Sequence, residues 1–179
     1  MAPFPFFLLQ CFFYILPAYF ANMAPVIMKD TFKSWAVPID RMFGKEVFGS
    51  HKTWRGLIFG VVFASVVTYL QSVLSRYPSF KSLLFFDYSV WLLFGILMGL
   101  GALLGDMAES FIKRQLKLRP GARFVPWDQL DFVIGAMLLS SVVFVPSAAI
   151  ITAVVIMTFV LDIAVNHIAF YLKIRSEKW

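Results

Sequence analysis

The sequence predicts an all-α integral membrane protein with five transmembrane helices, an N-terminus outside the cell and a cytoplasmic C-terminus. Of its 179 residues, 60% are apolar, and the mean hydropathy is +0.80, whereas soluble domains average about 45–50% apolar residues. Five apolar stretches are candidate spans, at residues 4–28, 56–75, 88–105, 131–145 and 147–172. Fourteen of the sixteen Lys and Arg residues lie in two long loops and the C-terminal tail, which places these segments in the cytoplasm. We therefore expect one membrane domain, residues 1–179, whose two long cytoplasmic loops form the site.

The N-terminal stretch is expected to be a retained membrane helix. It has no basic leading region, and its apolar run exceeds the roughly 7–15 residues of a signal peptide. Pro17, Asn22 and Pro25 are kink or polar features within it. The single Cys11 excludes an intramolecular disulfide and a zinc site built from several cysteines.

Small residues indicate where the middle helices pack. Gly56 and Gly60 begin a four-residue repeat that Ala64 and Thr68 continue, and Gly95 and Gly99 have the same spacing. Such repeats let helices approach closely. The alternative is that Gly95 and Gly99 leave a groove for a lipid chain beneath the charged residues that follow.

The last two stretches are separated only by Pro146 and Ser147 and should form a tight antiparallel hairpin. The fourth is short for a span and can be lengthened by residues 125–130. The fifth carries Asp162 and Asn166 on one face, and an ionisable residue at this depth is either functional or bonded to a neighbouring helix.

The first long loop contains a candidate phosphate-binding motif at residues 49–56, directly before the second span. Glycines, hydroxyl groups and cations before a helix N-terminus can bind phosphate. The candidate nucleotide-binding residues here are Ser50, Lys52, Thr53 and Arg55. In the alternative interpretation Lys52 and Arg55 only orient the protein, and Trp54 anchors it at the membrane interface.

The second long loop begins as an extension of the third apolar helix. At 100° per residue, Asp106, Ser110, Lys113 and Lys117 fall on one face. Arg114 and Glu109 flank that face. These charges either bind a substrate or form pairs of ions one helical turn apart.

Three carboxylates are candidate metal ligands: Asp106, Asp128 and Asp131. Asp106 ends an apolar run, where an unpartnered carboxylate is costly, and a shared divalent ion would stabilise it. All-oxygen ligands favour Mg²⁺ or Mn²⁺ over zinc. Asp128 could instead only cap the fourth helix.

These motifs resemble those of a known superfamily. Residues 105–114, Gly-Asp-Met-Ala-Glu-Ser-Phe-Ile-Lys-Arg, together with Asp-Gln-Leu-Asp at 128–131, resemble the signature of the CTP-dependent phosphatidate cytidylyltransferases. Residues 50–56, Ser-His-Lys-Thr-Trp-Arg-Gly, are similar to an upstream element of that superfamily. The sequence is most similar to the archaeal branch, the CDP-archaeol synthases, which it resembles in length and in segments such as Pro38-Ile39-Asp40. The bacterial His-Gly-Gly before the aspartates is absent.

The resemblance implies a nucleotidyltransferase of phospholipid biosynthesis that uses CTP and Mg²⁺. The lipid substrate it implies is a glycerol phosphate with two ether-linked geranylgeranyl chains, and the products are CDP-archaeol and pyrophosphate. Catalysis would then involve Asp106, Lys113, Arg114, Asp128 and Asp131, with Ser50, Lys52, Thr53, Arg55 and Ser110 binding the nucleotide. We expect no nucleic-acid partner, and a multi-pass enzyme of the cell membrane whose site faces the cytoplasm. The alternatives are a bacterial-type phosphatidate cytidylyltransferase, a CTP-dependent polyprenol kinase and a transporter of anionic substrates.

Overall fold

The chain folds as a bundle of long helices, seen in a computed structural model that describes residues 3–42, 44, 47–118, 122, 124–171 and 173. The long helices are α1 (Phe4–Ile27), α2 (Trp54–Leu74), α4 (Trp91–Gln115), α5 (Trp127–Ser140) and α6 (Ala148–Tyr171). The short elements between them are η1 (Lys33–Trp35), η2 (Ile39–Met42), α3 (Pro78–Lys81) and η3 (Tyr88–Val90). The fold is thus all-α, as the sequence predicts.

Four of the described helices are long and apolar enough to cross a membrane: α1, α2, the helical segment Tyr88–Gln115 and α6. The fifth predicted span, at 131–145, corresponds to α5, which has only 14 residues. At 1.5 Å per residue it is about 21 Å long, shorter than a hydrocarbon core of about 30 Å. Where the sequence predicts five spans, the structure therefore has four helices long enough to cross a membrane and one shorter helix, α5.

The helix α5 begins at Trp127, within the extension by residues 125–130 that the sequence allowed. It ends at Ser140 rather than at the predicted Val145. After Ser140 the chain turns, with Phe144 N–H donating to the Ser140 carbonyl. The Phe144 ring then packs 5.1 Å from Phe86 and 5.7 Å from Tyr14, between ring centroids. Burial of this ring among other aromatic rings favours the turn over further helix.

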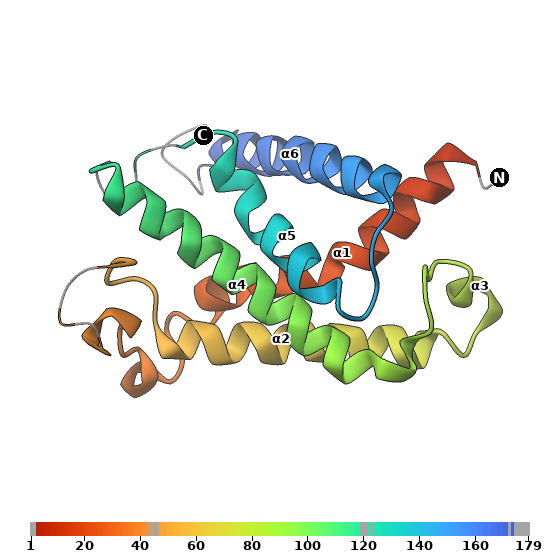
Figure 1. Ribbon diagram of the computed structural model, residues 1–179, viewed down its shortest axis with the longest axis horizontal. Helices are drawn as coiled ribbons and strands as arrows, with labels where there is room; N and C mark the ends of the chain where they lie inside the picture. The colour runs from red at the N-terminus through yellow and green to blue at the C-terminus, as the bar shows by residue number, and fades with distance from the viewer. Residues whose placement is uncertain are drawn as a thin grey trace.

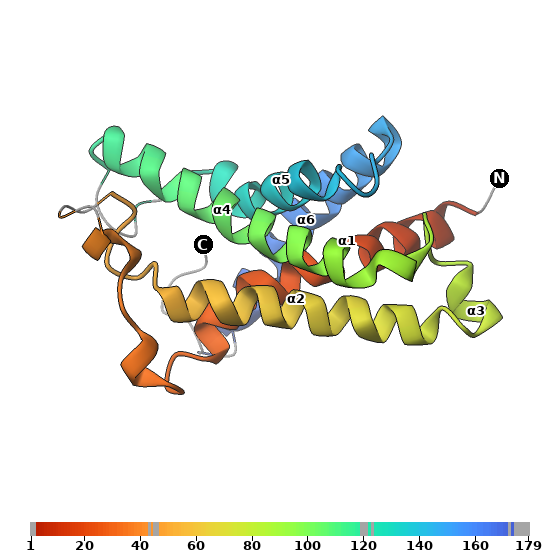
Figure 2. The same cartoon turned by 60° about the horizontal axis from the view of Figure 1, so that its bottom comes forward.

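The last two spans run in opposite directions, as predicted, but the tight turn predicted between them is wrong. Seven residues, 141–147, connect α5 to α6, and α5 packs mainly against α4. Figures 1 and 2 show α5 lying along α4, whereas α6 lies apart from α4 on the far side of α5.

Glycines allow the close contact of α4 with α5. A Cβ at Gly135 would lie 2.2 Å from the Gly101 carbonyl oxygen, and one at Gly105 would lie 2.2 Å from the Asp131 carbonyl oxygen. No side chain fits at these points. The contact places Asp131 of α5 directly beside the turn of α4 that carries Asp106.

The glycines of α4 nearer its start pack against α2 instead. A Cβ at Gly95 would lie 2.3 Å from Thr68 Oγ1, and one at Gly99 would lie 2.8 Å from the Val61 Cα. The prediction of close helix contact is confirmed at these positions. Gly95 and Gly99 leave no groove for a lipid chain.

Pro17 of α1 leaves a backbone carbonyl without its helical donor, and α2 supplies a replacement. A proline has no N–H to donate to the carbonyl four residues earlier, which here is that of Phe13. Gln71 Nε2 donates to the Phe13 carbonyl at 2.5 Å. Gln71 is 2% exposed, so this bond fixes the pairing of α1 with α2 inside the bundle.

The helix directions gather the site at one end of the bundle. The end of α1, the start of α2, the end of α4 and the start of α5 lie together, while α3 and the start of α1 lie at the opposite end (Figure 1). The predicted site motifs, which precede α2, end α4 and begin α5, are therefore brought to one end.

Candidate active site

Three carboxylates converge where α4 and α5 meet. Asp106, Glu109 and Asp131 each offer an oxygen, and these oxygens all lie within 4.8 Å of one another. Asp106 and Glu109 lie one turn apart on α4, and the glycine contact described above brings Asp131 across from α5. We call these residues the acidic triad. A group of three oxygen ligands at this spacing could hold a hard divalent cation.

The triad is only partly neutralised by the protein. Lys52 Nζ lies 2.5 Å from Asp106 Oδ2, and Lys113 Nζ lies 2.7 Å from Glu109 Oε1. Asp131 accepts a hydrogen bond from the Phe132 N–H at 2.6 Å, and among the described residues no cation is within ion-pair distance of it. An additional positive charge would stabilise this carboxylate.

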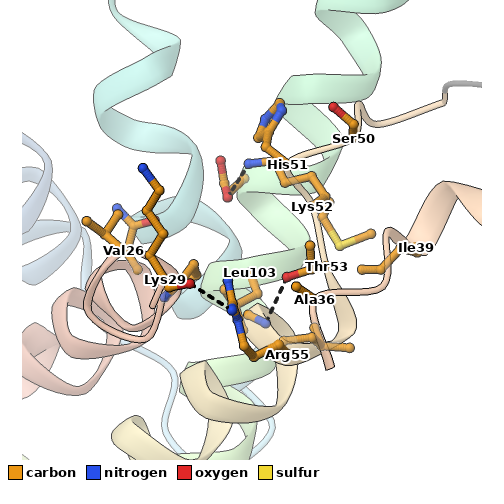
Figure 3. A pocket seen from close by; sticks show the side chains of 16 residues that line it. Val26, Lys29, Ala36, Ile39, Ser50, His51, Lys52, Thr53, Arg55 and Leu103 are labelled. Atoms are coloured by element: carbon orange, nitrogen blue, oxygen red, sulfur yellow. Dashed lines mark hydrogen bonds and ion pairs between the residues drawn. The ribbon is translucent and has the colours of Figure 1, made fainter. Parts of the chain in front are cut away.

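A cavity of about 720 Å³ opens beside the triad. It shares Asp106 with the triad and is lined by the end of α1, the loop before α2, the first turn of α2 and α4. Figure 3 shows Ser50, His51 and Lys52 on one side of it and Val26 and Lys29 on the other. The predicted residues Ser50, Lys52, Thr53 and Arg55 all line this cavity. The two loops predicted to form one site therefore meet at Asp106.

Thr53 and Arg55 also have structural roles. Thr53 is the N-cap of α2, and its Oγ1 accepts a hydrogen bond from the Gly56 N–H at 3.2 Å. Its hydroxyl hydrogen can still be donated. Arg55 is 7% exposed, and its Nη1 donates to the carbonyls of Lys29 at 2.9 Å and Thr31 at 3.0 Å. Arg55 therefore holds the chain after α1 against the start of α2.

Asp128 lies outside the triad, although the sequence predicted it as a ligand. It forms an ion pair with Lys113, and its Oδ2 accepts a hydrogen bond from the Phe124 N–H at 2.5 Å. Partial burial would raise the pKa of Asp128, but the bonds from Lys113 and Phe124 outweigh burial and lower the pKa. Because Lys113 contacts both Glu109 and Asp128, it links Asp128 to the triad.

The remaining predicted residues lie on or beyond α4. Ser110 is on α4 and 5% exposed, and Arg114 Nη1 donates to the Leu118 carbonyl at 3.3 Å. Among the described residues, the cavity lining includes neither of them. Lys117 was predicted on the same helical face as Asp106, but α4 ends at Gln115 and Lys117 has φ +55°. Its left-handed backbone takes it off that face.

His51 is not expected to add a positive charge to the cavity at neutral pH. Partial burial lowers the pKa of its imidazole, and the neighbouring Lys52 ammonium lowers it further. Lys29 is a lining cation that was counted in the sequence only as an orientation charge.

Glu109 is the triad member that sequence reasoning did not select. It was placed beside the charged face and interpreted as a possible helix ion pair, and it does form that pair with Lys113. Its burial, at 6% exposed, is the feature that sets it apart from a solvated helix charge.

Comparison with known proteins agrees with this geometry. The sequence model of the CarS-like family, described as CDP-archaeol synthase, matches residues 5–179. The chain belongs to the CDP-archaeol synthase family. The CDP-archaeol synthase of Pyrococcus furiosus is 34% identical, over 96% of this chain and 98% of that protein. That of Thermococcus onnurineus is 38% identical, over 96% and 97%.

A solved structure shares the fold. It is described as an intramembrane enzyme for archaeal membrane lipid biosynthesis, with a TM-score of 0.70 and 28% identity, over 87% of this chain and 91% of that one. The predicted activity, CTP-dependent cytidylyl transfer in archaeal lipid biosynthesis, is confirmed by family membership. The alternatives of a polyprenol kinase and a transporter are not supported.

Proposed function

We propose that the acidic triad and the adjoining cavity form the active site of this cytidylyltransferase. The triphosphate of CTP would bind where the triad and the cavity meet, at Asp106. The observation that supports this proposal is the shared position of Asp106, which belongs to the triad and also lines the lysine-containing cavity. A triphosphate needs both a divalent cation and fixed cations. Here the acidic triad could hold the divalent cation, and the adjoining cavity provides the fixed cations Lys29 and Lys52.

The triad fits Mg²⁺. Its ligands are three carboxylates, the hard oxygen donors that Mg²⁺ takes, and Asp131 has no protein cation as partner among the described residues. Asp106, Glu109 and Asp131 would hold the ion, in place of the predicted set of Asp106, Asp128 and Asp131. Bound there, Mg²⁺ would neutralise phosphate charge and favour departure of pyrophosphate.

The protein side chains bind and orient the substrates. Lys52 would exchange part of its contact with Asp106 for a phosphate oxygen, and Ser50 and Thr53 would donate hydrogen bonds from their hydroxyls. Lys113 would fix Glu109 and Asp128 in place, and Arg114 would order the end of α4. Arg55 would act mainly by holding the end of α1 over the cavity.

No protein nucleophile is required. The lipid phosphate is already ionised, so one of its oxygens can attack the α-phosphorus of CTP in line. A new P–O bond forms to the lipid phosphate, the bond between the α-phosphorus and the bridging oxygen breaks, and pyrophosphate leaves with that oxygen. The role of the protein is then positioning and electrostatic stabilisation.

The proposed lipid substrate is 2,3-bis-O-geranylgeranylglycerol 1-phosphate, used at the cytoplasmic face of the cell membrane. The test is mass spectrometry of the products formed from CTP and Mg²⁺ with this lipid, with a diacylglycerol phosphate or with a free polyprenol. We expect the CDP-lipid and pyrophosphate with the ether lipid. Preferred use of the diacyl lipid would indicate bacterial-type specificity, and CDP with a newly phosphorylated prenol would indicate a kinase.

A further inference from the structure

Asp40 is a buried carboxylate outside the acidic triad and outside the cavity lining. It lies in η2 and is 7% exposed. Its two oxygens accept hydrogen bonds from backbone N–H groups, at 2.9 and 3.2 Å from Phe48 and at 2.7 Å from Gly49. A buried carboxylate costs free energy unless it is hydrogen-bonded in this way. The two N–H groups thus provide its stabilisation.

The bonds of Asp40 fix the turn that leads into the Lys52 loop. Gly49 has φ +101°, a conformation that residues with a side chain rarely adopt. A Cβ there would lie 3.0 Å from His51 Cε1. Asp40 holds the N–H of this glycine, so it fixes the direction in which the chain leaves the turn.

Two backbone hydrogen bonds hold the other side of the same loop. The Ile39 N–H donates to the Lys52 carbonyl at 2.9 Å, and the Trp54 N–H donates to the Val37 carbonyl at 3.0 Å. Pro38 and Thr53 form an isolated antiparallel bridge between them. The segment before Asp40 therefore holds Lys52 from one side, and the Asp40 carboxylate holds Phe48 and Gly49 from the other.

We propose that Asp40 is a positioning residue that sets Lys52 for the triphosphate of CTP. Its carboxylate fixes the backbone at Gly49, this fixes the backbone of Lys52 three residues later, and Lys52 Nζ then reaches Asp106 at 2.5 Å. Asp40 is not a member of the triad and is not among the described residues that line the cavity, so we infer that it acts through the loop. This inference rests on the proposed role of Lys52 in binding CTP.

The test compares Asp40→Asn with Asp87→Asn in the full chain, in detergent or in liposomes. Asp87 also accepts a backbone hydrogen bond, from Ser89 at 3.1 Å, but it lies before α4 at the opposite end of the bundle. We expect Asp40→Asn to lower kcat/KM for CTP about tenfold, the loss typical of a charged hydrogen bond. The KM for the lipid should stay within about twofold of wild type. Asp87→Asn should change neither constant.

A double variant of Asp40 and Lys52 shows whether Asp40 acts by positioning Lys52 or only by stabilising the fold. The double variant Asp40→Asn/Lys52→Ala should be no slower than Lys52→Ala, because both changes remove the same contact. An equal rise in the KM for CTP and in the KM for the lipid would overturn the inference. Additive losses of kcat/KM for CTP in the double variant would overturn it as well. If Lys52→Ala is impaired and Asp40→Asn is normal, the role of Asp40 is wrong but the proposed CTP site stands. If Lys52→Ala itself has normal kinetics, the proposed CTP site is wrong.

Hydrogen exchange on the wild-type protein tests the geometry even where Asp40→Asn fails to fold. The amides of Phe48 and Gly49 should exchange slowly, because a buried carboxylate accepts both. Exchange of these two amides at the rate of an unprotected loop would contradict the inference.

Discussion

Glu109 combines two roles at the residue scale, since it belongs to the acidic triad and also pairs with Lys113 at 2.7 Å. Glu109→Gln keeps the size of the side chain and removes its charge. If Glu109 is a metal ligand, the Mg²⁺ concentration for half-maximal activity should rise about tenfold or more, since ligand carboxylates provide the charge that Mg²⁺ requires. The measurement is a Mg²⁺ titration of CDP-lipid formation at saturating CTP. Asp87→Asn is the control. An unchanged Mg²⁺ titration for Glu109→Gln would show that Glu109 is not a metal ligand and only forms an ion pair with Lys113.

Asp128 and Asp131 should differ in their dependence on metal, although the sequence predicted both as ligands. Asp131→Asn removes a member of the triad and should raise the Mg²⁺ requirement. Asp128→Asn leaves the triad intact and breaks the ion pair with Lys113. We expect it to lower kcat/KM up to about tenfold, with the Mg²⁺ requirement within about twofold. The two variants are compared in parallel Mg²⁺ titrations, and equal shifts would establish Asp128 as a ligand.

The site residues show what sequence could and could not predict. The sequence selected Asp106 because it ends an apolar run, where an unpartnered carboxylate is costly. The pattern left Lys52 open as an orientation charge, and the resemblance of residues 50–56 and 128–131 to family motifs supported Lys52 and Asp131 as site residues. The approach of Asp131 to Glu109, and the pairing of Asp128 with Lys113, depend on how α4 crosses α5, which no local pattern encodes. That crossing decides which carboxylates lie together in the triad and which one pairs with Lys113.

At the scale of elements, hydropathy located every long helix but not the full length of each. The stripe of charges on one face predicted that α4 extends beyond its apolar run, and it continues to Gln115. The end of α5 depends on the aromatic cluster around Phe144, whose members come from several segments of the chain. Its early stop therefore has no signal in the sequence of α5 itself.

The contact of α4 with α5 should be intolerant of any added side chain. Gly135→Ala puts a Cβ 2.2 Å from the Gly101 carbonyl oxygen, a backbone atom that cannot rotate away. We expect a loss of at least about 1–3 kcal/mol in unfolding free energy, as for other overpacked cores. Activity should fall too, because Asp131 would move away from Asp106.

Thermal unfolding in detergent measures this loss, and Gly56→Ala provides the comparison. A Cβ at Gly56 would lie 3.3 Å from Pro25 Cβ and Cγ, which requires only a small shift. Gly56→Ala should therefore unfold closer to wild type than Gly135→Ala does. Similar melting temperatures for Gly135→Ala and wild type would show that α4 and α5 are not packed this closely.

At the scale of the whole molecule, the helix directions bear on orientation in the membrane. Successive long helices run in alternating directions, and α5 runs back from the site end despite its 14 residues (Figures 1 and 2). The first residues of α1 and the last residues of α6 therefore lie at opposite ends of the bundle. Together with the concentration of Lys and Arg at the site end, this predicts an N-terminus outside and a site in the cytoplasm.

Cysteine labelling in intact cells tests this orientation, because the sequence has a single cysteine, Cys11, which is buried and can be removed by Cys11→Ala before new cysteines are introduced. Ser34 lies in η1 at the site end and Ser79 in α3 at the other end, and both are exposed. In the Cys11→Ala background, a membrane-impermeant maleimide should label Ser79→Cys in intact cells. It should label Ser34→Cys only after permeabilisation. CDP-lipid formation by both variants would show that each is folded, and labelling of Ser34→Cys in intact cells would place the site outside, where CTP is not supplied.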